Sequence, residues 1–272
     1  MDLKITDNLL DNGEFYEDIV SKNTFYIHHT AGSHNPINTI YGWETDKTSK
    51  GNVLRVATSF IIGGLSTSFS KGKYDDQFDG VIYRTFDEKK WAHHLGTKFP
   101  HNVMLNQQSV AVELCNYGPI TLGKDGKFYN YVNREVPKEM VIKLDKPFRG
   151  YAYYHAYTDK QIEALKNLIV YSREKFPNIP LNTPLLTVNG FEVNADATAG
   201  KPGIYGHSNV RKDKFDMSPQ PKLIEMLKSL VSPKTSSPSE NKILLPNPPE
   251  KPNPGFYGIR GFDGNNDFSN LA

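Results

Sequence analysis

The chain has 272 residues, 38% of them hydrophobic and 23% charged, and a formal net charge of +2 at pH 7. This composition is ordinary for a globular protein, and the small net charge argues against a broad basic surface for nucleic acid. Cys115 is the only cysteine, so an internal disulfide is excluded. No apolar run approaches the roughly 18 residues of a membrane-spanning helix, and the N-terminus lacks the pattern of a signal peptide. We therefore expect no membrane span and synthesis in the cytoplasm without a signal peptide.

Apolar and β-branched runs predict four β-strands, and glycine-containing turns bound them. The runs cover residues 25–29, 59–62, 81–86 and 110–114. The last of them alternates poorly between apolar and polar side chains, which favours a strand that is covered on both faces.

Helices are predicted before and after these strands. One begins at an Asn-Pro pair and covers residues 36–43, and another begins at a capping box formed by Thr158 and Gln161. The second helix should end at Phe176, because the residue before a proline disfavours helical geometry. Pro221 predicts the start of a final helix. This order of elements predicts an α/β fold with a single mixed β-sheet flanked by helices.

The chain divides into a domain and an extension. We expect one domain over residues 1–231, interrupted by insertions at about 118–157 and 181–203, where the strand and helix periodicity is lost. Residues 232–254 are rich in Pro and Ser and predict an extended linker. Residues 255–272 mix aromatic residues with glycines and are too few for an independent domain, so we expect them to dock on a partner or on the domain itself.

Two adjacent histidines, His28 and His29, end the first predicted strand in the stretch TFYIHHTAG. Neighbouring residues on a strand point to opposite faces, so the two rings cannot share one role. One of them therefore faces a different environment from the other.

A second histidine-containing segment, GHSNVRKDKFD, holds His207, Lys214 and Asp216. A histidine and a carboxylate from this segment, with a histidine from a distant strand, would make a His/His/Asp set with a fourth position open to water, as in a catalytic zinc site. In the alternative interpretation, His207 lies on the surface and Asp216 caps the final helix. The spacing alone leaves both open.

Four pieces of the chain together resemble the zinc-dependent N-acetylmuramoyl-L-alanine amidases, the type-2 amidase family of phage endolysins and animal peptidoglycan-recognition proteins. They are YIHHTAG, WAHHLG, SVAVELCNYG and IYGHSNVRKDKFDMSP, in the order typical of the family. The resemblance covers residues 25–230 and implies the amidase/peptidoglycan-recognition fold. The chain departs from it at residues 216–219, which read Asp-Met-Ser-Pro where the family has Asp-Pro-Gly-Pro.

The resemblance implies a set of metal ligands. His28 and His207 match two zinc ligands, and Asp216 matches the third, which is Asp or Cys in the family. Asp213 lies close enough in sequence to compete as the third ligand. The resemblance therefore implies Zn²⁺ as the cofactor and leaves His29 in a structural role.

Three further residues match functional positions of the family. Glu113 matches the glutamate of the Ser-x-Gly-x-Glu strand, Lys214 matches the catalytic lysine two residues before the third ligand, and His94 matches a histidine of the substrate cleft. Taken alone, Glu113 could instead pair with a neighbouring lysine, and Lys214 could be a solvated loop residue. The resemblance implies that Glu113 and Lys214 are catalytic and that His94 binds substrate.

The implied activity is cleavage of the amide bond between N-acetylmuramic acid and L-alanine, with bacterial peptidoglycan as the partner. The alternatives are a stem-peptide zinc peptidase on the same scaffold and a non-catalytic peptidoglycan-binding or structural component of a phage or injection particle. Without an export signal, we expect release or delivery to the cell wall, as for a phage endolysin or the cargo of an injection system.

Overall fold

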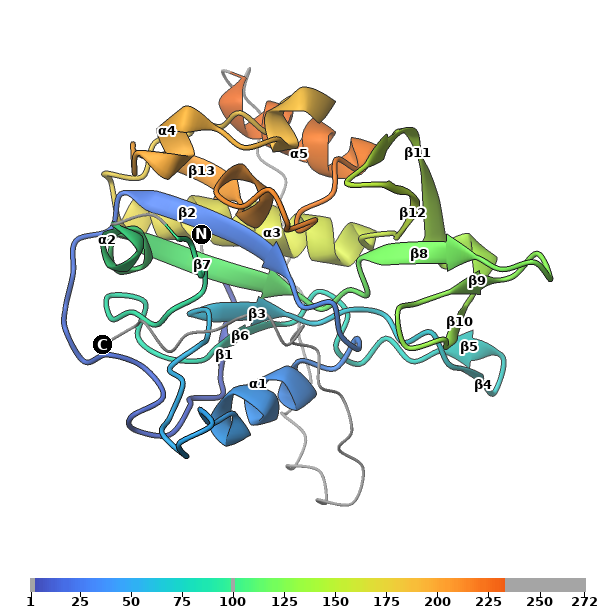
Figure 1. Cartoon of the computed structure of the whole chain (residues 1–272), viewed down its shortest axis with the longest axis horizontal. Helices are drawn as coiled ribbons and strands as arrows, with labels where there is room; N and C mark the ends of the chain where they lie inside the picture. Colours follow the sequence, from blue (N-terminus) through green and yellow to red (C-terminus); the bar gives the residue numbers. More distant parts are fainter. Residues whose placement is uncertain (1–2, 99–100, 233–272) are drawn as a thin grey trace.

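The computed structural model describes residues 3–98 and 101–232, and Figure 1 shows the arrangement of their elements. A six-stranded sheet with the order β1-β6-β3-β7-β2-β13 forms the centre. Its strands are β1 (Thr6–Asp7), β2 (Thr24–His29), β3 (Phe60–Ile62), β6 (Ile82–Arg84), β7 (Ser109–Leu114) and β13 (Gly203–Gly206). The sheet is mixed, because β1 and β6 are parallel to each other and run antiparallel to β3, β7, β2 and β13, which are mutually parallel.

The register of the parallel strands brings polar side chains to one edge of the sheet. His28 lies directly opposite Glu113 in the pairing of β2 with β7. The same pairing places both residues near the carboxyl ends of their strands, and β13 ends beside them at Gly206. Three strands therefore deliver their carboxyl ends to one place, a common position for functional groups in parallel sheets.

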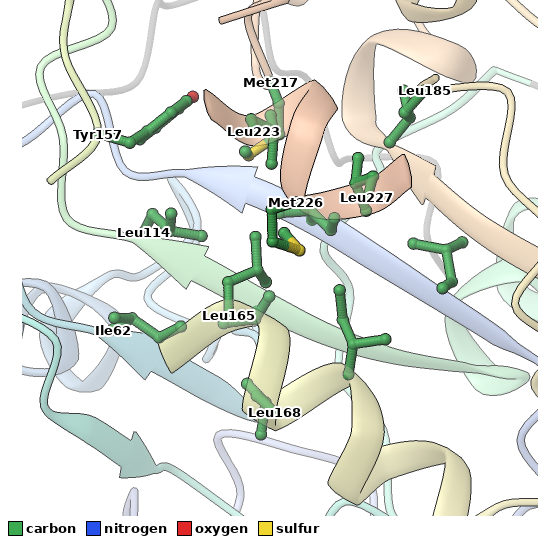
Figure 2. Close-up of a cluster of buried hydrophobic side chains, with 14 of the residues drawn as sticks. Ile62, Leu114, Tyr157, Leu165, Leu168, Leu185, Met217, Leu223, Met226 and Leu227 are labelled. Atoms are coloured by element: carbon green, nitrogen blue, oxygen red, sulfur yellow. The ribbon is translucent and has the colours of Figure 1, made fainter. Parts of the chain in front are cut away.

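Two helices cover one face of the central sheet. They are α3 (Asp159–Lys175) and α5 (Pro221–Val231), and their buried leucines pack against alternate residues of the strands. Figure 2 shows this core, with Leu165 and Leu168 of α3 and Leu223 and Leu227 of α5 facing the sheet. Removing this many apolar side chains from water, at about 25 cal/mol per Å² of buried area, provides the main stabilisation of the fold.

The opposite face carries smaller apolar clusters under α1 (Pro36–Thr45), α2 (Asn102–Gln107) and α4 (Ala195–Thr198). In one cluster Trp43 of α1 packs with Ile61 of β3, and in another Leu105 of α2 packs with Tyr26 of β2. His28 and Glu113 project on this second face, because the strand alternation places Phe25 and Ile27 on the first. The polar site is thus bordered by apolar clusters.

The observed helices begin and end where the local sequence signals predict. Asn35 caps α1 by accepting a hydrogen bond from the backbone N–H of Ile37, and Thr158 and Gln161 form the predicted capping box of α3. Helix α3 ends at Lys175, before the Phe-Pro pair, and α5 begins at Pro221. The four predicted strands and three predicted helices are confirmed to within two residues at their starts.

The first predicted insertion, residues 118–157, folds into a second sheet beyond the carboxyl ends of β2 and β7 (Figure 1). It is antiparallel, in the order β10-β9-β8-β12-β11. Its elements are β8 (Pro119–Leu122), β9 (Phe128–Tyr129), β10 (Glu135–Val136), η1 (Lys138–Met140), β11 (Val141–Phe148) and β12 (Tyr151–His155). The sequence predicted an insertion without a clear period, and it did not predict that these strands pair into a sheet.

The remaining elements are short. They are the hairpin β4 (Phe69–Ser70) and β5 (Lys73–Tyr74), and the 3-10 turns η2 (Val188–Phe191) and η3 (His207–Asn209). In the part of the chain that the structure describes, no helix has the length and apolar character needed to cross a bilayer. Nearly all of the predicted linker and the whole tail at 255–272 lie outside the described residues.

Candidate metal centre

Three buried donor atoms converge at the carboxyl ends of β2 and β13. His28 ends β2, His207 follows β13 in η3, and Asp216 lies nine residues further on. His28 Nδ1 is 3.0 Å from His207 Nδ1 and 3.2 Å from Asp216 Oδ2, and the distance from His207 Nδ1 to that oxygen is 3.0 Å. All three residues are at most 6% exposed. The structure thus brings together the two histidines and the aspartate that the sequence singled out.

The hydrogen bonds of His207 show why this triangle suits a cation. Its Nε2 lies 2.8 Å from the backbone carbonyl oxygen of Leu95, which can only accept, so Nε2 carries the proton. In the neutral ring, Nδ1 then presents a lone pair to His28 and Asp216. Ligands of a tetrahedral zinc, at about 2.0–2.1 Å from the metal, lie about 3.3–3.4 Å apart, close to the observed spacing. The donor set therefore fits Zn²⁺.

Electrostatics keep the donors in the forms that bind metals. Burial, followed by the charge of His207, lowers the pKa of His28 to about 4, so its ring is neutral at neutral pH. The pKa of the Asp216 carboxyl lies well below its usual range, because burial, which would raise it, is outweighed by the charge and hydrogen bonds that His207 and His28 provide in their protonated forms. The site thus combines neutral imidazole with an anionic carboxylate, as metal binding requires.

Glu113 lies beside this triangle on the neighbouring strand, opposite His28 in the register. Its Oε2 is buried and has no hydrogen-bond partner among the described residues. Burial raises the pKa of the Glu113 carboxyl well above its usual range, the charge of Asp216 raises it further, and Lys214 acts in the opposite direction. A carboxyl with a raised pKa and a free oxygen is able to exchange a proton with a bound molecule.

The loop before Asp216 directs Lys214 and Asp216 toward the site and leaves Asp213, the competing third ligand, exposed. Lys214 is half-buried and close enough to influence the pKa values of Glu113 and His28. Asp213 is exposed and forms an ion pair with Arg211, 3.0 Å from Oδ1 to the guanidinium Nε. The structure therefore places Asp216, and not Asp213, beside the two histidines.

His29 points to the opposite face of the sheet. Its Nδ1 is 2.9 Å from the hydroxyl of Tyr157, and its ring lies against Phe215 with 6.3 Å between ring centroids. Gly118, with φ of +73°, lies so close that a Cβ there would be 2.6 Å from His29 Nε2. The adjacent histidines are thus divided between the two faces, as the strand alternation predicts.

His94 lies behind His28, with its Nδ1 3.0 Å from His28 Nε2 and its own Nε2 2.7 Å from the hydroxyl of Ser109. The predicted contact of His94 with substrate stays a prediction, since both of its ring nitrogens have partners inside the protein. Sequence reasoning assigned no role to Ser109, although it opens the strand that carries Glu113. The only available signal was its place in the SVAVEL run, which does not show that it contacts a histidine 15 residues away.

The geometry agrees with an independent match to a protein family. Residues 21–221 match the family described as N-acetylmuramoyl-L-alanine amidase, Amidase_2. The chain belongs to this amidase family. The match includes every residue of the metal centre together with both insertions. No curated protein matches this amidase-family chain in sequence.

Several solved structures are similar to this amidase-family chain at low identity. The amidase LysC from Clostridium intestinale URNW is 13% identical over 84% of this chain and 97% of its own, with a TM-score of 0.41. A selenomethionine derivative of AmpD is 16% identical over 84% of this chain and 94% of its own, with a TM-score of 0.45. Drosophila peptidoglycan recognition protein SD is 12% identical over 85% of this chain and 94% of its own, with a TM-score of 0.41.

Proposed function

We propose that this chain is a zinc-dependent N-acetylmuramoyl-L-alanine amidase that hydrolyses the amide bond between N-acetylmuramic acid and L-alanine in peptidoglycan. The observation that carries the proposal is the triangle of His28, His207 and Asp216 beside Glu113, whose buried Oε2 has no hydrogen-bond partner in the described part of the chain. In a member of the amidase family, a filled ligand set next to a buried base supports catalysis over binding alone.

The metal ligands would be His28 Nδ1, His207 Nδ1 and Asp216 Oδ2, which already converge. A zinc ion held there would lower the pKa of water toward ~7 and polarise the scissile carbonyl. The protein supplies one negative charge and two neutral rings, so the site keeps net positive charge when the ion is bound. That charge favours a transition state in which the carbonyl oxygen becomes negative.

Glu113 would act as the general base. Its carboxylate takes a proton from the attacking water and returns it to the nitrogen of the leaving alanine, which departs as a neutral amine. The raised pKa of Glu113 suits both steps, because a weak acid holds the proton long enough to deliver it. A base of this kind contributes typically about 10²–10⁴-fold to the rate.

Lys214 would stabilise the developing negative charge on the carbonyl oxygen. Its influence on the pKa values of both Glu113 and His28 supports this role, because the charge must lie near these two side chains to exert it. A fixed cation at that position helps the transition state more than the neutral ground state.

The direct test is digestion of purified peptidoglycan by wild type and by Glu113→Gln, each with zinc and with a chelator. Glu163→Gln is the matched control, because Glu163 is exposed on α3 and far in sequence from the site. We expect new N-terminal alanine, identified by end-group labelling, from wild type and Glu163→Gln with zinc only. Glu113→Gln should bind zinc but lose about 10²–10⁴-fold in rate.

Each other outcome points to a different function. New amino groups on another stem residue would keep the zinc site and indicate a stem-peptide peptidase. Zinc binding without any release of amino groups would indicate a peptidoglycan-binding or structural protein. A wild-type protein that binds no zinc at neutral pH would overturn the proposal.

A further inference from the structure

The Nε2 atoms of both histidine ligands, which point away from the triangle, contact two consecutive residues. His28 Nε2 faces the side chain of His94 at 3.0 Å, and His207 Nε2 donates to the carbonyl oxygen of Leu95 at 2.8 Å. His28 ends β2 and His207 lies in η3, directly after the neighbouring strand β13, but one short segment determines the orientation of both rings. Whatever fixes this segment also fixes where the two Nδ1 lone pairs point.

Asn106, in helix α2, holds that segment in place. Its side-chain oxygen accepts hydrogen bonds from the backbone N–H of His94 at 2.8 Å and of Leu95 at 3.1 Å. Its side-chain nitrogen donates to the backbone oxygen of Asn102 at 2.7 Å, which fixes the orientation of the amide. Asn106 is 1% exposed, so water cannot replace these bonds.

Ser109 sets the direction of the hydrogen bonds that reach His28. The backbone oxygen of Asn106, 3.0 Å from the Ser109 hydroxyl, can only accept, so the single hydroxyl proton of Ser109 points there. The hydroxyl must then accept from His94 Nε2, which lies 2.7 Å away. In the neutral ring, His94 Nδ1 is left as an acceptor, and His28 Nε2 must donate to it.

The consequence appears at the metal centre. With its proton on Nε2, the neutral ring of His28 has no proton on Nδ1, as already follows for His207 from its bond to Leu95. The triangle therefore contains three acceptor atoms and no proton to bridge them. That arrangement repels itself until a cation binds.

We propose that Ser109 and Asn106 are positioning residues that preset the metal centre, Ser109 by fixing the His28 tautomer through His94, and Asn106 by clamping the 94–95 backbone. This inference rests on the proposed zinc site and assigns functions to two residues outside it. It also gives His94 a role within the protein, because His94 links the metal ligand His28 to Ser109 by hydrogen bonds.

The hydrogen-bond direction can be measured without metal. Side-chain ¹H–¹⁵N NMR of histidine-labelled wild type, in chelator at pH 8, reports which nitrogen of each ring carries the proton. We expect protonated Nε2 and unprotonated Nδ1 for His28, His94 and His207. A proton on Nδ1 of His94 would overturn the proposal, and this result does not depend on zinc binding or on amidase activity.

Variants then test whether the tautomer matters for the metal. Ser109→Ala removes the acceptor for His94 Nε2, so both His94 and His28 become free to reverse, and we expect about 10–100-fold weaker zinc binding by competition with a chromophoric chelator. Ser109→Thr keeps the hydroxyl and should restore binding. Ser59→Ala is the matched control: Ser59 is also buried and lines the same small cavity as Ser109, and among the described residues its hydroxyl bonds only to the backbone of Ala111.

The outcomes separate this inference from the proposed function. Zinc affinity of Ser109→Ala equal to that of Ser59→Ala would overturn the positioning role while leaving the amidase intact. Wild type that binds no zinc would overturn the proposed function, and the NMR of the metal-free protein would still decide the tautomers. If Ser109→Ala fails to fold, judged by circular dichroism, Ser109→Thr and the wild-type spectra decide the matter.

Discussion

The two faces of the central sheet hold adjacent buried histidines in opposite ways. On the first, His29 directs Nδ1 to the hydroxyl of Tyr157, and these two groups can form one ordinary hydrogen bond. On the second, His28 directs Nδ1 at two other atoms that also offer lone pairs, on His207 and Asp216. The covering layers differ as well, since large leucine-rich helices cover the His29 face and smaller clusters border the His28 face.

This difference distinguishes a structural buried polar group from a functional one. Buried polar groups in proteins are normally satisfied in donor–acceptor pairs, as Nδ1 of His29 is by Tyr157, whereas His29 Nε2 has no hydrogen-bond partner among the described residues. A group of converging acceptors costs stability unless a cation joins them, so its presence indicates a binding role. Both His28 and His29 are buried histidines. They differ in what faces Nδ1: two atoms that offer lone pairs for His28, and a single hydroxyl for His29.

The largest expected effect comes from exchanging the two histidines for alanine one at a time. His28→Ala removes a metal ligand and should abolish stoichiometric zinc binding and hydrolysis. His29→Ala should keep zinc at one equivalent and lose about 1–3 kcal/mol of stability, because the Tyr157 hydroxyl loses a buried partner. Zinc content by atomic absorption and urea unfolding measure the two effects. Equal zinc loss in both variants would end the distinction between the faces.

The next effect concerns Lys214 on the His28 face. Lys214→Met removes the cation proposed to stabilise the oxyanion and should lower kcat by about 10²–10³-fold with zinc content unchanged. Lys212→Met, two residues earlier and exposed, is the matched control and should retain the wild-type rate. A Lys214→Met enzyme with normal kcat would remove this residue from the mechanism.

Acid should destabilise the metal-free protein through His155, a buried histidine of β12 whose pKa is influenced by His29. Burial first, with a further lowering by His29 and His34, sets the pKa of His155 to about 4, against about 6.5 in the unfolded chain. The unfolded state therefore takes up the proton first, and stability falls as the pH drops from about 6.5 toward 4, by about 3 kcal/mol for this residue.

His155→Asn keeps an acceptor for the backbone N–H of Tyr117 but does not titrate. Urea unfolding in chelator at pH 7 and pH 4 should show that wild type loses about 3 kcal/mol more than this variant. The same pH dependence in both proteins would show that His155 is not held neutral by the fold.

The smallest expected effect tests the packing against His29. Gly118 has a positive φ and would place a Cβ 2.6 Å from His29 Nε2, so Gly118→Ala should destabilise the fold by about 1–2 kcal/mol. Gly126→Ala is the matched control, because its φ is also positive, at +78°, but a Cβ there would meet no atom of the described residues within 4 Å, its two chain neighbours aside. The difference between the two variants in thermal unfolding isolates the contact with His29 from the backbone strain.

Local sequence signals were sufficient for several parts of the fold. The capping box at Thr158, the Asn-Pro start of α1 and Pro221 at the start of α5 act within one turn of helix, so neighbouring residues decide them. The strand period likewise separated His28 from His29, because alternation is a property of the extended backbone itself. The mixed sheet flanked by helices followed from the order of these elements.

Other features depended on contacts between distant segments. The short strand β13 carries a sequence, GIYG, with little strand preference, and it forms because pairing with β2 satisfies its backbone. The antiparallel sheet at 119–155 is built from strands of two to eight residues whose pairing partners the chain order does not specify. Tertiary hydrogen bonds decided these elements.

By itself, the sequence determined which residue types were available for a metal site and that His28 and His29 point to opposite faces of their strand. Only the tertiary structure decided between Asp213 and Asp216, because Arg211 holds the first outside while the loop turns the second inward. It alone also joined His94 to Ser109 and Asn106 to the 94–95 backbone. The physical reason is that hydrogen-bond direction and lone-pair convergence are set by positions in space, which spacing along the chain does not specify.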